Sequence, residues 1–153
     1  KSSLSKIFHQ TNSFLDKRIE KLFKLITTAN EKTDKDYEEK KAKAKKDETI
    51  PKPTIEERVA NLKSQFEQLD QDEVAFYQKF PNVFYQNIFS LDATQIQQVK
   101  TESLKIIDDK MKDHVREADL DSIRQSAIEK IQFLDVTSVM QQVIRYLVNE
   151  VIV

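Results

Sequence analysis

Few side chains in this sequence have the chemistry for catalysis. His9 and His114 are the two histidines among 153 residues, and there is no cysteine. Nucleophilic catalysis needs a nucleophile held beside a base, and it commonly uses a strained turn and backbone N–H groups that stabilise an oxyanion. No glycine is present to build such a turn. We therefore predict that this chain is not itself an enzyme.

A group of candidate metal ligands gathers where one predicted helix ends. The group consists of Asp108, Asp109, Asp113, His114, Glu117 and Asp119. Asp109 and Asp113 are four residues apart and so share one helix face. Lysines at 110 and 112 are interleaved with the acids, however, and a divalent metal needs convergent ligands with supporting hydrogen bonds. We predict a solvated acidic helix end, with no metal and no cofactor in this chain.

The densest aromatic stretch is a candidate ligand-binding site. Its residues are Phe76, Tyr77, Phe80, Phe84 and Tyr85. Small-molecule pockets are commonly lined by such side chains. The alternative is ordinary core packing, because burying one phenylalanine stabilises a fold by about 1.5 to 3 kcal/mol. Both interpretations stay open at the level of sequence, with core packing favoured.

The absence of glycine indicates the fold class. At the usual share of about 7%, a chain of this length would hold roughly eleven glycines, and this one has none. Tight hairpins favour glycine at their corners, and phosphate-binding loops need it. We predict an all-α bundle of about six or seven helices, without a sheet. The net charge of -1 argues against a nucleic-acid partner.

Three amphipathic helices are predicted between residues 90 and 147. Asp92 and Gln95 have the spacing of a capping box, in which each side chain binds the backbone N–H of the other residue. Asp119 and Asp135 are the predicted N-caps of the next two helices. Apolar residues then recur at steps of three and four, which is typical of a helix with one buried face.

The first half of the chain contains further helical patterns. Thr54 and Glu57 form another candidate capping box, and Pro81 is expected to divide the aromatic stretch into two short helices. Near the start of the chain, the polar segment 9–12 is expected to break the helix, with Thr11 or Asn12 capping a long helix that begins after it. We expect the core to come mostly from residues 14–26, 96–111 and 136–148.

The segment from residue 27 to residue 53 is dominated by charge. Between positions 31 and 48, seven acidic residues and seven lysines leave a net charge of zero. We predict either a solvated helix or a linker here, ended by Pro51 and Pro53. Residues 1–153 as a whole are expected to form a single helical domain. Because the sequence begins at Lys1 without a methionine, we expect it to be a fragment of a larger protein.

Several short motifs resemble a known family. They are Leu91-Asp92, Val115-Arg116, Asp119-Leu120, Leu134-Asp135 and Arg145-Tyr146-Leu147, together with the apolar stripe at Phe14, Leu15, Ile19, Leu22 and Phe23. With the intervening helices they resemble the extracytoplasmic domain of bacterial seven-transmembrane HD-type phosphohydrolases. The sequence departs from that family after Leu147, where Val148, Asn149 and Glu150 replace a frequent Leu-x-Pro-Asn.

The resemblance implies a sensory or regulatory role outside the cytoplasm, in a parent protein that hydrolyses cyclic di-AMP through an intracellular metal site. The implied partners are an unidentified extracytoplasmic ligand or protein, the parent's own transmembrane helices and a second copy of the chain in a homodimer. The implied location is the extracytoplasmic face of the bacterial plasma membrane. The competing hypothesis is a cytoplasmic helical adaptor or scaffold domain, which would present an exposed apolar groove to a partner helix.

Overall fold

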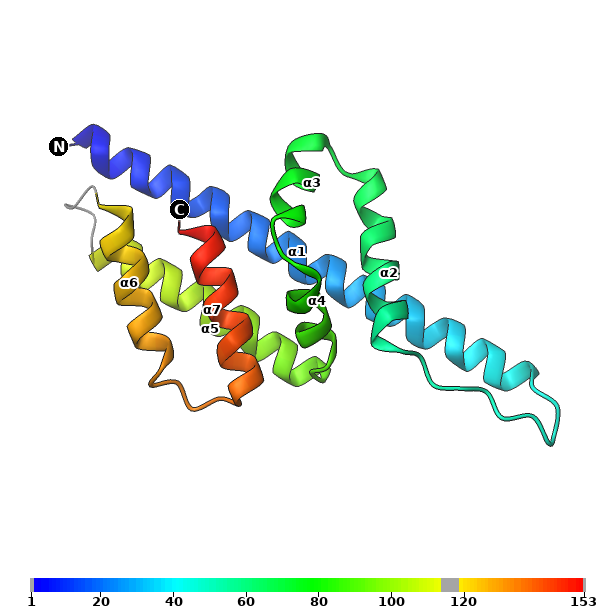
Figure 1. The fold of residues 1–153 in the computed structure, drawn as a ribbon. Coiled ribbons are helices and arrows are strands. Elements are labelled where there is room, and N and C mark those ends of the chain that lie inside the picture. Colours follow the sequence, from blue (N-terminus) through cyan, green and yellow to red (C-terminus); the bar gives the residue numbers. More distant parts are fainter. Residues whose placement is uncertain (1, 114–118, 153) are drawn as a thin grey trace. The chain divides into compact units, whose positions relative to one another are not determined.

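A computed structural model describes the backbone of residues 2–113 and 119–152, and the side chains of residues 16–113 and 119–152. In these ranges all regular structure is helical, which confirms the all-α prediction (Figure 1). The elements are α1 Ser2–Lys43, α2 Ile55–Gln65, the 3-10 helix η1 Phe66–Gln68, α3 Gln71–Gln78, α4 Asn82–Phe89, α5 Ala93–Asp113, α6 Leu120–Ile131 and α7 Ser138–Val151. By their contacts they form two compact units, one of residues Lys1–Lys21 and Leu91–Val153 and the other of Leu22–Ser90.

Helix α1 is one continuous helix of 42 residues. The predicted break at residues 9–12, with Thr11 or Asn12 as a new N-cap, is therefore wrong. Polar residues do not by themselves end a helix, and this segment contains neither glycine nor proline. Starting a second helix would require a new nucleation step, whereas extending the first adds a hydrogen bond for each residue.

The charged segment is partly helical. Helix α1 continues through it to Lys43, and residues 44–54 between α1 and α2 are not helical. Most charged side chains of α1 in this segment are exposed, while Ala29 and Thr33 are buried and Tyr37 is half-buried. These three residues are four apart and mark the face of α1 that is covered.

Within the unit Leu22–Ser90, α1 and α2 are joined by polar side chains. Arg58 of α2 donates to Asn30 Oδ1 at 2.9 Å and to Asp34 Oδ1 at 2.7 Å. One turn further along, Asn61 donates to the hydroxyl of Thr33 at 2.6 Å. Apolar packing in the same unit comes from Ile26, Leu62 and Ile88, which are fully buried. These contacts position α2 and α4, the helices on two sides of the pocket described below.

The local signals around the aromatic stretch are confirmed. Thr54 accepts the N–H of Glu57 at 3.1 Å and caps α2. Pro81 separates α3 from α4, because its ring fixes φ and it has no N–H to continue the preceding helix. The chain therefore turns back on itself there, and the aromatic residues of α3 and α4 come together.

In the other unit, α5, α6 and α7 pack against one another. The capping box of α5 is confirmed: Asp92 N–H donates to Gln95 Oε1 at 3.0 Å, and Gln95 N–H donates to Asp92 Oδ1 at 2.8 Å. Asp119 caps α6 by accepting two backbone N–H groups, as predicted. The apolar stripe of α7 supplies much of the core, with Val143, Ile144, Leu147 and Val148 all fully buried.

The predicted cap of α7 is wrong by two residues. Helix α7 begins at Ser138, and Thr137 accepts the N–H of Met140 at 3.2 Å, so Thr137 rather than Asp135 is the N-cap. Both residue types are good caps. The apolar stripe of the helix, including Met140, Val143 and Ile144, is buried as the sequence pattern predicts.

Candidate ligand-binding site

The aromatic residues of α3, α4 and η1 form one connected cluster. Phe80 stacks on Phe84 with ring centroids 4.6 Å apart, and Phe66 of η1 stacks on Tyr77 at 5.7 Å. Tyr85 joins the two pairs, since its ring lies 6.4 Å from both Phe66 and Phe80. Offset and edge-on contacts of this kind are favourable beyond the apolar area that they bury.

Most of the cluster is core. Tyr77 and Phe84 have no exposed surface, Tyr85 is 1% exposed and Phe80 is 4% exposed. Phe76 is half-buried at the edge of the cluster, in edge-on contact with Tyr77 and Phe80. Most of the surface of these side chains is therefore buried in the core, in agreement with the interpretation favoured from the sequence.

The phenol of Tyr85 is tied to the backbone of α3. Its hydroxyl donates to the carbonyl oxygen of Tyr77 at 2.6 Å. Burial raises the pKa of this phenol above its ordinary value, and the neighbouring Tyr77 adds to the rise. Tyr85 is thus a neutral hydrogen-bond donor at physiological pH, and it ties α4 to α3.

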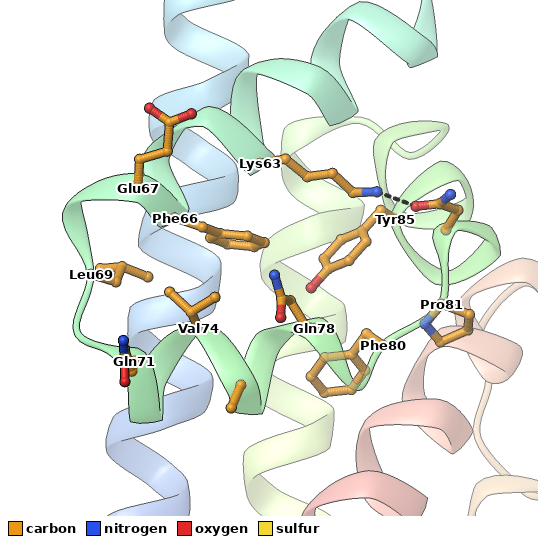
Figure 2. A pocket seen from close by; sticks show the side chains of 12 residues that line it. Lys63, Phe66, Glu67, Leu69, Gln71, Val74, Gln78, Phe80, Pro81 and Tyr85 are labelled. Carbon is orange, nitrogen blue, oxygen red and sulfur yellow. Dashed lines mark hydrogen bonds between the residues drawn. The ribbon is translucent and has the colours of Figure 1, made fainter.

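A pocket of about 780 Å³ opens beside this cluster (Figure 2). Residues of α2, η1, α3 and α4 and of their connections line it: Lys63, Phe66, Glu67, Leu69, Gln71, Val74, Ala75, Gln78, Phe80, Pro81, Asn82 and Tyr85. Two of the five predicted site residues, Phe80 and Tyr85, therefore line the pocket. Phe76, Tyr77 and Phe84 do not. Whether the pocket binds a ligand stays a prediction.

The pocket also contains polar side chains that no sequence pattern predicts. Lys63 of α2 donates to Asn82 Oδ1 of α4, a hydrogen bond drawn as the dashed line from Lys63 in Figure 2. Gln78 of α3 lies between the rings of Phe66 and Tyr85 in the same view. These residues come from helices that meet only in the folded chain. No local sequence signal indicates that Lys63 and Asn82 are neighbours.

The acidic helix end contains ion pairs. Asp108 pairs with Lys112 at 3.0 Å, and Asp109 pairs with Lys130 of α6 at 3.2 Å. Asp113 is exposed and Asp119 caps α6, while His114 and Glu117 lie outside the described residues. Among residues 16–113 and 119–152, no three histidine or acidic side chains are grouped so that they could hold a metal ion.

No helix in the described part of the chain is both long enough and apolar enough to cross a membrane. No curated protein and no solved structure matches the chain. A family model described as 7TM-HD extracellular matches residues 6–153. That match spans nearly the whole sequence and agrees with the resemblance carried by the helix and connector motifs. The chain therefore belongs to the family of extracellular domains of seven-transmembrane HD proteins.

Proposed function

We propose that this chain is the sensory or regulatory domain of a membrane-bound HD phosphohydrolase, and that its parent protein hydrolyses cyclic di-AMP. The observation that carries the proposal is the family match over residues 6–153, which assigns the chain to the extracellular side of a membrane protein. A domain outside the membrane can influence an intracellular site only through the membrane helices that connect them. The partners would be those helices and an unidentified extracellular ligand or protein.

Two structural features support this role. The first part of α1 and all of α7 belong to the same compact unit, so a change in their packing would act on both ends of the chain together. The unit Leu22–Ser90 contains an open pocket of about 780 Å³, within the range of roughly 300 to 1,000 Å³ that is common for small-molecule sites. A cytoplasmic adaptor, the competing hypothesis, does not agree with membership of an extracellular family.

The proposed mechanism is a shift between two packing arrangements. A ligand can bias such an equilibrium only by as much as its affinities for the two arrangements differ. Helix α7 is a suitable element to carry the shift, because Val143, Ile144 and Leu147 bury one face of it against the rest of its unit.

The test uses the parent protein in lipid nanodiscs, with hydrolysis of cyclic di-AMP as the readout and cyclic di-GMP as the comparison substrate. Val143→Ala loosens the buried face of α7, and Gln142→Ala on its exposed face is the matched control. We expect Val143→Ala to change the hydrolysis rate and Gln142→Ala to leave it unchanged. A parent that hydrolyses neither nucleotide contradicts the assigned activity. Equal rates in all three proteins contradict the regulatory role.

A further inference from the structure

We propose that the pocket in the unit Leu22–Ser90 binds a carboxylate attached to an apolar body. This inference rests on the proposed sensory function, because it names the chemical class that the sensor would take. It depends on how the ammonium group of Lys63, the side-chain amides and the aromatic rings are arranged around the pocket. A free small acid and the C-terminus of a peptide share this chemistry.

The hydrogen bond between Lys63 and Asn82 defines the donor side of the pocket. Lys63 Nζ donates to Asn82 Oδ1, so the amide of Asn82 is oriented with its oxygen toward the lysine. An asparagine amide has two N–H donors on its nitrogen, and a lysine ammonium has three. One donor of Lys63 is used in this bond, which leaves further donors on both groups at the same rim. Two adjacent donor groups, one of them charged, match the two oxygens of a carboxylate.

The charge around the pocket favours an anion over a cation on this side. Lys63 and Glu67 are the charged residues of the lining. They lie one turn apart, but Figure 2 shows the carboxylate of Glu67 pointing away from the rings of Phe66 and Tyr85, while the side chain of Lys63 extends on the side of Tyr85. Gln71 and Gln78 add neutral amides. A bound anion would therefore contact the ammonium of Lys63 without facing the carboxylate of Glu67.

The remainder of the lining fits an apolar group. The lining has an aliphatic wall of Leu69, Val74 and Ala75 and also includes the rings of Phe66 and Phe80. These rings are 6% and 4% exposed, so each offers a ligand only a small part of its surface. An aryl or alkyl group would fit here, whereas a sugar that stacks on a ring face would not.

The experiment titrates the whole 153-residue chain, labelled with nitrogen-15, with 4-phenylbutyrate and with its neutral analogue 4-phenylbutanamide. We expect amide resonances within residues 63–85, which include the whole lining, to shift. We expect the acid to bind about two- to fivefold more tightly than the neutral analogue, as is usual for a partly exposed ion pair. Acetylglycylphenylalanine, which ends in a peptide carboxylate, is the second arm. The tighter of the two acids identifies the source of the carboxylate.

Two variants make the result specific to the pocket. Lys63→Met should remove the preference for the acid, while Glu67→Gln, its neighbour on the next turn, should retain it. Ala75→Leu fills the aliphatic wall at an exposed position of α3 and should weaken binding of both compounds. Equal affinity of the native chain for the acid and the neutral analogue, or shifts that lie outside the pocket-lining range of residues 63–85, would overturn the inference.

The outcome is separable from that of the proposed function. If the acid binds in the pocket but leaves the parent's hydrolysis rate unchanged, the binding site is supported and the sensory role fails. If hydrolysis responds to changes in α7 but neither acid binds residues 63–85, the regulatory role stands and the carboxylate site is wrong.

Discussion

At the scale of single residues, Tyr85 both forms a buried hydrogen bond and has a raised pKa. Its buried hydroxyl donates to the carbonyl of Tyr77 at 2.6 Å. Replacing it in Tyr85→Phe removes this hydrogen bond, while the Phe80 N–H still donates to the same carbonyl at 3.3 Å. Because the Tyr77 carbonyl keeps the Phe80 N–H as a partner, we expect the free energy of unfolding at pH 7 to fall by only about 1 kcal/mol. Urea unfolding followed by circular dichroism measures it.

The raised pKa of Tyr85 gives the same variant a pH dependence. The ordinary pKa is 10.0, and burial raises it in the folded chain. Above pH 10 the unfolded chain releases the proton that the folded chain keeps, so the free energy of unfolding falls as the pH rises. We expect Tyr85→Phe to reduce this fall between pH 9 and pH 11. Equal slopes in native protein and Tyr85→Phe would contradict the assignment.

Asp16 shows the same kind of shift at lower pH, so that its charge is already unfavourable in the folded chain at neutral pH. Its Oδ1 is buried without a hydrogen-bond partner among the described residues. Burial raises the pKa of this carboxyl above 3.8, and the neighbouring Asp108 and Glu20 raise it further. A carboxyl whose pKa is raised on folding destabilises the fold at neutral pH. This destabilisation diminishes as the pH falls through the pKa that Asp16 has in the folded chain.

Asp16→Asn should therefore stabilise the protein at pH 7 and lose that advantage near pH 4. The carboxyl is only partly buried, so solvent screening keeps the expected gain below about 1 kcal/mol. Asp109→Asn is the matched control, since it removes an acid that pairs with Lys130 at 3.2 Å, and it should not stabilise. Thermal unfolding at pH 4 and pH 7 compares the variants. A gain that is independent of pH would assign the effect to something other than the charge.

At the scale of helices, the sequence predicts starting points well where one strong cap stands alone. Asp92 with Gln95, Thr54 and Asp119 all cap the helices predicted for them. The predicted break within α1 is wrong. Whether a helix continues through a polar segment depends on its length and its tertiary contacts, and no local signal indicates either. The pocket shows the same limit. Its aromatic density is visible in the sequence, but the pairing of Lys63 with Asn82 requires the folded arrangement of α2 and α4.

The N-cap of α7 allows a direct test of local preference against structure. Thr137 accepts the N–H of Met140 at 3.2 Å, whereas Asp135 is exposed and lies outside the helix. We expect Thr137→Ala to lower the free energy of unfolding by about 1 kcal/mol. Asp135→Ala should change it by less than about 0.5 kcal/mol, as is usual for exposed positions. A reversal of these two values would return the cap to Asp135.

At the scale of the whole molecule, α1 is the element that belongs to both compact units, since they divide between Lys21 and Leu22. The prediction that residues 1–153 form a single domain therefore becomes a prediction about cooperativity. If one unit unfolded alone, α1 would have to break in its interior, where each residue is stabilised by hydrogen bonds on both sides. We expect the two units to unfold together in one transition.

Two buried residues of similar size test this cooperativity. Leu62 lies in the unit Leu22–Ser90 and Ile144 in the other unit, and both are fully buried. Each change to alanine should cost about 2 to 5 kcal/mol. Under cooperative unfolding, either variant lowers the protection of amides in both α2 and α7 against hydrogen exchange, because both exchange through the same global opening. If Ile144→Ala lowered protection in α5 to α7 while α2 kept its native value, the two units would be separate domains.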